Sequence, residues 1–148
     1  MLGRTYDGQN CSAARALEVI GERWSLLILR DSLLRGLRRF GDFQASLGVA
    51  RNVLSARLDL LVREGLLTKR RYSAHPDHYE YLPTEKGVDV VPVIVALTSW
   101  GDRWAAPDGP PVVFTHAECG GELTQTLYCA GCAATLPARE VRAVPASR

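Results

Sequence analysis

The feature that most constrains this chain is a pair of short helical patterns joined by a tight turn and followed at once by a basic hairpin. In residues 40–47 the apolar side chains Phe40, Phe43 and Leu47 are three and four apart, as on one face of a helix, and Gly48 follows at the turn. A second apolar stripe in residues 50–64 consists of Leu54, Leu58, Leu61 and Val62. Two helices joined this closely predict a helix-turn-helix, whose second helix enters the major groove of DNA.

A hairpin with a basic outgoing strand follows the second helix. Residues 68–73 form a short extended run, residues 74–77 a turn that contains a proline, and residues 78–82 a returning strand. Side chains alternate along a strand, so Tyr79 and Tyr81 fall on one face. Helix, turn, helix and hairpin in this order are typical of a winged helix, with the hairpin as its wing. The alternative is a helical hairpin beside an ordinary hairpin whose basic residues serve solubility.

Positive charge is concentrated in this same part of the chain. The whole sequence is nearly balanced, with 18 Lys and Arg residues against 16 Asp and Glu residues. Residues 30–71 contain ten basic and four acidic side chains, whereas residues 72–148 contain five basic and nine acidic ones. A localised positive field favours a polyanion, and we expect double-stranded DNA as the partner. A membrane surface would also attract such a field, but the sequence contains no amphipathic basic helix and no lipidation signal.

Particular side chains of the second helix and the wing are candidates for DNA contact. Opposite the apolar stripe, near the start of the helix, lie Arg51, Asn52 and Ser55, which we expect to reach base edges. Asparagine can pair with adenine and arginine with guanine through two hydrogen bonds. The expected phosphate or minor-groove contacts are Arg57, Lys69, Arg70 and Arg71.

Further helical patterns flank this module. Residues 11–20 and 24–34 precede it, and an apolar run from Thr84 to Trp104 follows it, with Thr84 as the expected N-cap. Pro92 should kink this last helix, because proline removes one backbone hydrogen bond. The helix is longer than a small winged helix needs for its own core, so we expect it to dimerise with a second copy.

The sequence predicts a mainly helical α+β chain: a winged helix-turn-helix with a long C-terminal dimerisation helix and a small zinc-ribbon-like tail. The expected parts are a DNA-binding and dimerisation domain in residues 1–104, a Pro/Gly linker in 105–111 and a Cys/His module in 112–148. No apolar run approaches the ~20 residues of a membrane span, and the N-terminus lacks a signal-peptide pattern. We therefore expect a cytoplasmic protein, in which structural disulfides are disfavoured.

The tail carries a metal-ligand pattern. His116 and Cys119 form one pair and Cys129 and Cys132 another, each spaced by two intervening residues, with nine residues between the pairs. Three thiolates and an imidazole would complete a closed tetrahedral site for structural zinc. A reversible Cys129–Cys132 disulfide and a reduced, metal-free tail remain as alternatives.

The chain resembles the HxlR-type winged helix-turn-helix transcriptional regulators from Cys11 to about Trp104. Four motifs carry the resemblance: the Gly-x-x-Trp segment at 21–27, the Arg39-Phe40 pair, the Leu-x-x-Arg-Leu-x-x-Leu helix from 54, and Tyr81-Leu82-Pro83-Thr84. The resemblance implies a homodimer built from the first and last helices, bound to a pseudo-palindromic operator, and we expect it to repress transcription. Ala50 departs from the pattern, because such proteins usually place a Ser or Thr cap there.

The resemblance also implies a candidate sensor. Family members often detect electrophiles or oxidants through a cysteine just before the first helix, where Cys11 falls. A helix N-terminus lowers the pKa of a thiol, and Arg15 lies nearby. The alternative is that Cys11 is a small half-buried residue without chemistry.

An enzyme is not expected. The sequence contains no glycine-rich phosphate loop, nucleophile elbow or His-Glu-x-x-His motif. His75 and His78 fall in the wing turn, where solvent exposure or phosphate contact is the simpler interpretation. The alternative function is a metal- or redox-dependent protein-interaction module whose winged helix does not bind DNA.

Overall fold

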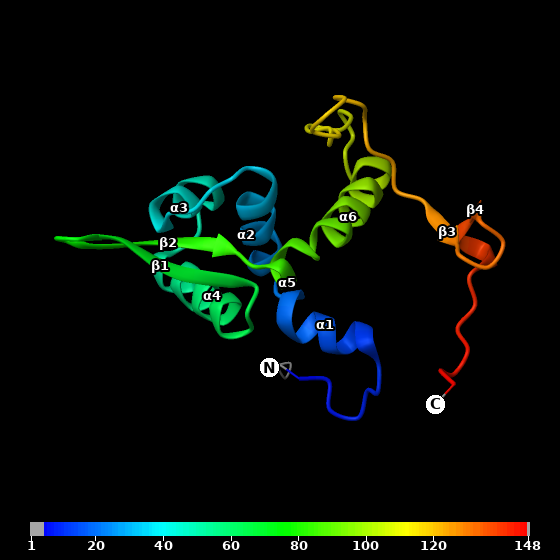
Figure 1. The fold of residues 1–148 in the computed structure, drawn as a ribbon, viewed down its shortest axis with the longest axis horizontal. Helices are drawn as coiled ribbons and strands as arrows, with labels where there is room; N and C mark the ends of the chain where they lie inside the picture. The colour runs from blue at the N-terminus through cyan, green and yellow to red at the C-terminus, as the bar shows by residue number, and fades with distance from the viewer. Residues whose placement is uncertain (1–4, 148) are drawn as a thin grey trace. The chain divides into compact units, whose positions relative to one another are not determined.

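The computed structural model describes residues 5–147, which divide into two compact units on either side of the Ile94–Val95 bond. The first unit begins with the helices α1 (Ser12–Ile20), α2 (Arg23–Leu34), α3 (Phe40–Leu47) and α4 (Arg51–Arg63). Strands β1 (Leu67–Ala74) and β2 (Asp77–Pro83) and the short helix α5 (Glu85–Val88) follow them (Figure 1). The predicted helix-turn-helix and wing are both confirmed.

Helices α3 and α4 meet through a turn that the sequence specifies. Gly48 ends α3 in the left-handed conformation, with φ 61°, and its N–H bonds to the carbonyl of Gln44 at 2.9 Å. Ala50 is the N-cap of α4 and offers no side-chain oxygen, so the first amides of that helix have no side-chain cap. The helix therefore begins where the apolar stripe predicts, although the usual capping residue is absent.

The core of the first unit lies where α2, α3, α4 and the base of the wing converge. Its fully buried side chains include Ile28 and Leu29 from α2, Phe43 from α3, and three of the four residues of the predicted stripe of α4, whereas Val62 is partly buried. The stripe residues Leu54, Leu58 and Leu61 are each 0% exposed. Each such burial contributes about 1.5–3 kcal/mol relative to an exposed side chain, so this cluster fixes the position of α4.

The wing is an antiparallel pair anchored at its base. Register runs from Leu67 opposite Pro83 to Ala74 opposite Asp77, with an irregularity between Arg71 and Ser73. At the base, the backbone N–H of Tyr81 donates to the carbonyl of Arg38 at 2.7 Å, and Tyr81 is buried. The wing is therefore held against the segment between α2 and α3.

Thr84 is the N-cap of α5, as predicted, and its Oγ1 accepts from the N–H of Gly87 at 3.1 Å. The same hydroxyl donates to the carbonyl of Gly65 at 2.6 Å, which joins the end of α4 to the end of the wing. Gly87 is buried, and a Cβ at this position would lie only 2.2 Å from the carbonyl oxygen of Leu66. Only glycine allows this close approach.

The prediction of one kinked helix from Thr84 to Trp104 is wrong. The chain forms α5 and then, after a turn at residues 89–90, a separate helix α6 (Val91–Trp104). Pro92 lies in the first turn of α6, where a missing N–H costs nothing, instead of inside a longer helix, where its ring would clash with a carbonyl. Proline here starts a helix and does not bend one.

The second unit contains most of α6 and two small β features. Thr115 and Glu122 form an isolated antiparallel bridge, and β3 (Leu127–Cys129) pairs with β4 (Ala134–Leu136). A short 3-10 helix (Ala138–Glu140) follows. No residue between 95 and 147 is buried, so this segment has no apolar core of its own. Within residues 5–147, no helix has the length and apolar character required to cross a membrane.

Candidate nucleic-acid interface

The outer face of α4 is polar and open. Burial of Leu54, Leu58 and Leu61 turns the opposite face to solvent, and the predicted base-contacting residues Arg51, Asn52 and Ser55 are all exposed. They lie in the first turn and a half of the helix, the part that a recognition helix inserts into the major groove. The structure thus places all three on one accessible surface.

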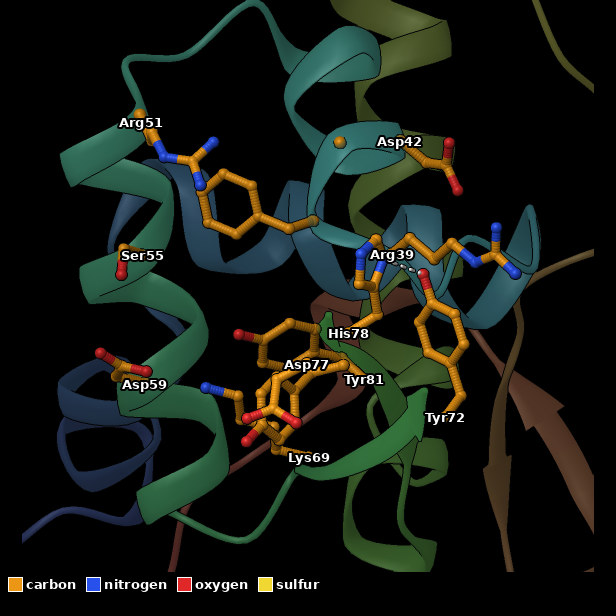
Figure 2. Close-up of a pocket in the computed structure, with 13 residues that line it drawn as sticks. Arg39, Asp42, Arg51, Ser55, Asp59, Lys69, Tyr72, Asp77, His78 and Tyr81 are labelled. Carbon is orange, nitrogen blue, oxygen red and sulfur yellow. Dashed lines mark hydrogen bonds between the residues drawn. The ribbon is translucent and has the colours of Figure 1, made fainter. Parts of the chain in front are cut away.

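A groove of about 620 Å³ separates this face of α4 from the wing (Figure 2). The start of α3 closes one end of it. The lining residues are Arg39, Phe40, Gly41, Asp42, Arg51, Ser55, Asp59, Lys69, Tyr72, Asp77, His78, Tyr79 and Tyr81. Three basic side chains, three aspartates and four aromatic rings line it, and the basic side chains are the groups that a phosphate backbone would contact.

The cations of the groove rest on aromatic rings. The guanidinium carbon of Arg51 is 4.7 Å from the centre of the Phe40 ring, and that of Arg39 is 4.6 Å from the Tyr72 ring. Lys69 Nζ lies 4.6 Å from the Tyr79 ring and 5.9 Å from the Tyr81 ring, which confirms that these two tyrosines share one face. Such contacts contribute about 0.5–1 kcal/mol at exposed sites, and they hold the charges in place before any anion arrives.

Tyr72 connects the wing to α3. Its Oη lies 3.0 Å from His78 Nδ1 across the hairpin, and the Arg39 guanidinium lies over its ring (Figure 2). Arg39 itself is the N-cap of α3 and bridges to Glu80 through its backbone. Arg39, Tyr72 and His78 therefore form one connected group at the groove, made of residues from the start of α3, β1 and β2.

The other two predicted wing contacts are partly neutralised. Arg70 pairs with Glu80 across the hairpin, with Nε donating to Oε1 at 2.9 Å, and Arg71 Nη1 lies 3.2 Å from Asp77 Oδ1. Both arginines remain more than half exposed, but neither lines the groove. Of the three basic wing residues predicted to hold phosphates, only Lys69 lies in the groove.

Arg57 is engaged inside the protein. Its Nε lies 3.4 Å from Oε2 of Glu22, at ion-pair distance without the geometry of a hydrogen bond, and its side chain is 23% exposed. Glu22 also caps α2 by accepting from the N–H of Trp24 at 3.0 Å. Arg57 thus links α4 to the start of α2, a position that favours holding the recognition helix over contacting DNA.

Cys11 is the N-cap of α1 and is exposed. The backbone N–H groups of Ala14 and Ala13 lower the pKa of the thiol, and the nearby charge of Arg15 lowers it further, although the Cys11 side chain makes no capping hydrogen bond to the helix. This placement matches the predicted sensor position.

The four tail residues form two pairs. His116 Nδ1 lies 3.3 Å from Cys119 Sγ, whereas Cys129 ends β3 and Cys132 lies in the turn that leads to β4. The N–H groups of Cys132 and Gly131 and the Cys132 thiol lower the pKa of Cys129. In the described part of the chain, no three His, Cys, Asp or Glu side chains come together as a metal site would require.

Sequence reasoning missed Arg39 and Tyr72 as groove residues. Arg39 immediately precedes the predicted start of a helix, and Tyr72 lies in the predicted basic strand, so each had a local signal. Their pairing depends on the wing folding back toward α3, across 33 residues of chain. Only the tertiary structure shows that arrangement.

Comparison with known proteins identifies this arrangement. Residues 19–109 match the family described as HxlR-like helix-turn-helix. A relative in Mycobacterium bovis, named as the HTH-type transcriptional regulator Mb3122, is 42% identical over 145 residues, which are 97% of this chain and 90% of that protein.

Solved structures agree with this match. That of PA1607, named as a candidate transcription factor, is 38% identical with a TM-score of 0.81 and covers 93% of this chain and 96% of its own. That of the redox regulator HypR in its oxidised form is 26% identical with a TM-score of 0.57 and covers 63% of this chain and 96% of its own. This chain therefore belongs to the HxlR-like helix-turn-helix family and is a transcriptional regulator with a DNA-binding fold.

Proposed function

We propose that this regulator acts as a homodimeric, sequence-specific repressor on a pseudo-palindromic operator. The observation that carries the proposal is the groove between α4 and the wing, with Arg39, Arg51 and Lys69 held on aromatic rings beside the exposed face of α4. A duplex placed with its major groove on α4 would bring a phosphate strand to these cations.

Recognition of the base sequence is assigned to the residues at the start of α4. Arg51, Asn52 and Ser55 supply donors and acceptors for base edges, and Lys69, with Arg39 added by the structure, supplies phosphate contact. Arg70 and Arg71 add positive potential at the wing, although Glu80 and Asp77 reduce it. Arg57 contributes by holding α4 against Glu22.

The homodimer is supported by an apolar stripe on α6. Val93, Leu97, Trp100 and Trp104 are 45%, 54%, 62% and 65% exposed, and their spacing of four, three and four residues puts them on one side of the helix. Leu17 on α1 is also 48% exposed. Large apolar side chains left in water in this pattern favour burial against a second copy. Repression follows if the dimer occludes a promoter.

Cys11 is the proposed site of response to electrophiles or oxidants. An exposed thiol with a lowered pKa at a helix N-terminus reacts through its thiolate. The similarity to HypR, named as a redox regulator, supports this assignment. Modification beside α1 would act on the dimer through the helix that Cys11 caps.

A gel-shift titration against the DNA upstream of its own gene tests the proposed function. The wild-type chain should bind this DNA more tightly than a shuffled duplex of the same length. Lys69→Ala should reduce the dependence of log K on log salt by about 1, because one phosphate contact is lost. Arg142→Ala, which removes an exposed charge of the tail, is the matched control and should leave the slope unchanged. Equal affinity for both duplexes would contradict sequence-specific binding.

A further inference from the structure

The tail contains four metal-ligand side chains that the DNA interface does not use. They form two pairs of identical spacing, His116 with Cys119 and Cys129 with Cys132, separated by nine residues. All four belong to the compact unit that begins at Val95, and the three cysteines are free thiols. They lie outside the unit that contains the helix-turn-helix.

Each pair lies at the turn of a small antiparallel hairpin. In the first hairpin, Thr115 bridges to Glu122, and the N–H of Gly120 donates to the carbonyl of His116 at 2.8 Å. In the second hairpin, Cys129 ends β3 opposite Ala134 of β4, with Cys132 in the turn between them. The chain thus builds the same local structure twice.

The two turns also share an unusual backbone conformation. The residue after the second member of each pair is left-handed: Gly120 has φ 70° and Ala133 has φ 55°. Glycine adopts this conformation freely, but alanine is disfavoured there because its Cβ approaches the backbone. The turn shape is kept at Ala133 in spite of that cost, which indicates that the shape serves the pair that precedes it.

A glycine lies against a sulfur in both turns. The N–H of Gly121 donates to Cys119 Sγ at 3.4 Å, and a Cβ on Gly121 would lie only 3.2 Å from that sulfur. In the second turn, a Cβ on Gly131 would lie 3.6 Å from Cys129 Sγ. A turn that holds two ligand side chains, separated by two residues, has the form of one half of a tetrahedral metal site.

The segment needs a cross-link of some kind. No residue between 95 and 147 is buried, and a segment this small cannot form a stabilising core by itself. Two half-sites of two ligands each supply the four that zinc takes in a closed site. In residues 5–147 these pairs stay apart and no third ligand joins either one, so a metal would have to draw them together.

We propose that the tail binds one zinc ion per chain through the His116 imidazole and the Cys119, Cys129 and Cys132 thiolates. Binding joins the two hairpins into one module. Three thiol protons leave as the zinc–sulfur bonds form, and the zinc with three thiolates carries a single negative charge. All four positions are filled by protein, so the site is structural and holds no reactive water.

Metal analysis of the full chain purified without added metal tests the proposal. We expect one zinc per chain, and cobalt replacing it should give the visible bands and the thiolate charge-transfer band of tetrahedral coordination. Cys129→Ser should lose both signals. Cys11→Ser, which removes the cysteine outside the tail, should retain them. His116→Cys keeps four ligands, so it should retain zinc with an altered cobalt spectrum, whereas His116→Ala should bind zinc far more weakly.

A mixing experiment tests whether one chain supplies all four ligands. A variant lacking His116 and Cys119 is combined with one lacking Cys129 and Cys132. Each variant alone and the mixture should bind no zinc above background. Restored binding in the mixture would overturn the single-chain site. Zinc-free wild-type protein that does not take up added zinc or cobalt under reducing conditions, or a quantitative Cys129–Cys132 disulfide in the protein as purified, would overturn the metal site itself.

Discussion

Ser46 Oγ donates a hydrogen bond of 2.6 Å to Oδ2 of Asp31, a carboxylate that is completely buried. Asp31 lies on α2 and Ser46 on α3, so this bond joins the two helices directly. The other carboxylate oxygen of Asp31 pairs with Arg30 at 2.8 Å and Arg35 at 3.4 Å. A buried charge is tolerated when it is paired and hydrogen-bonded in this way, and here it fixes α3 against α2.

Ser46→Ala should therefore reduce the free energy of unfolding by about 1–3 kcal/mol, because a buried acceptor loses its donor. Chemical denaturation of the DNA-free protein measures the change. Ser55→Ala on the exposed face of α4 is the matched control and should stay within about 0.5 kcal/mol of wild type. Equal effects of both substitutions would mean that the Ser46–Asp31 bond contributes nothing to stability.

The local patterns of the sequence were enough to predict the helix-turn-helix and the wing. Apolar spacing, Gly48 and alternating strand residues act over a few neighbours, and the structure places these elements as expected. The Asp31–Ser46 bond could not be predicted this way, because its partners are fifteen residues apart and an acid in an apolar helix gives no sign of its partner.

Contacts between distant elements also decide the candidate site. The position of Arg57 on its helix predicts a DNA contact, but the Arg57 side chain instead pairs with Glu22, the N-cap of α2. The apolar run from Thr84 to Trp104 predicts one helix, but the structure has two. Gly87 of the first packs closely against the backbone of Leu66, and Pro92 lies in the first turn of the second. Periodicity alone contains neither piece of information.

Gly87→Ala should destabilise the fold by about 1–3 kcal/mol, as overpacking does in a close-packed interior. The new Cβ would lie 2.2 Å from the carbonyl oxygen of Leu66, which is backbone and cannot swing away. Gly101→Ala has nothing within 4 Å and should instead stabilise α6 by about 0.5–1 kcal/mol. The thermal unfolding midpoints of the two variants should shift in opposite directions. An unchanged midpoint for Gly87→Ala would show that α5 is not closely packed against Leu66.

Leu97→Glu should convert the proposed dimer to monomers, because it puts a charge into the apolar stripe of α6. Sedimentation velocity at several protein concentrations measures this. Ser99→Glu introduces the same charge at an exposed position on the other side of α6 and should leave the dimer intact. Dimers that persist in Leu97→Glu would assign the interface to a different surface.

Cys11 should react with iodoacetamide at lower pH than an ordinary cysteine. Because its pKa is lowered, the thiolate is already present below the usual titration range, and the reaction rate should level off earlier as pH rises. Arg15→Gln removes the charge that adds to the effect of the backbone N–H groups and should move the profile slightly toward higher pH. Labelling followed by peptide mass spectrometry resolves Cys11 from the tail cysteines. A profile identical to that of a free cysteine peptide would remove the basis for its sensing role.

Asn52 tests base reading at a single position. It is exposed in the first turn of α4 beside Arg51, and asparagine can bond adenine through two hydrogen bonds. Asn52→Ala should weaken binding to the preferred site by about 1–3 kcal/mol and relax the preference at one base position. Uniform weakening across all sequences would identify Asn52 as a backbone contact.

In vitro selection from random duplexes, carried out in parallel with the wild-type chain and Asn52→Ala, tests the central claim most directly. The wild-type chain should enrich two inverted half-sites whose centres lie about 10 bp apart or a multiple of it, since two recognition helices face the same side of the duplex. Asn52→Ala should enrich the same arrangement with one symmetric pair of positions randomised. Enrichment of no sequence, or of a single unpaired motif, would contradict a dimeric, sequence-specific regulator.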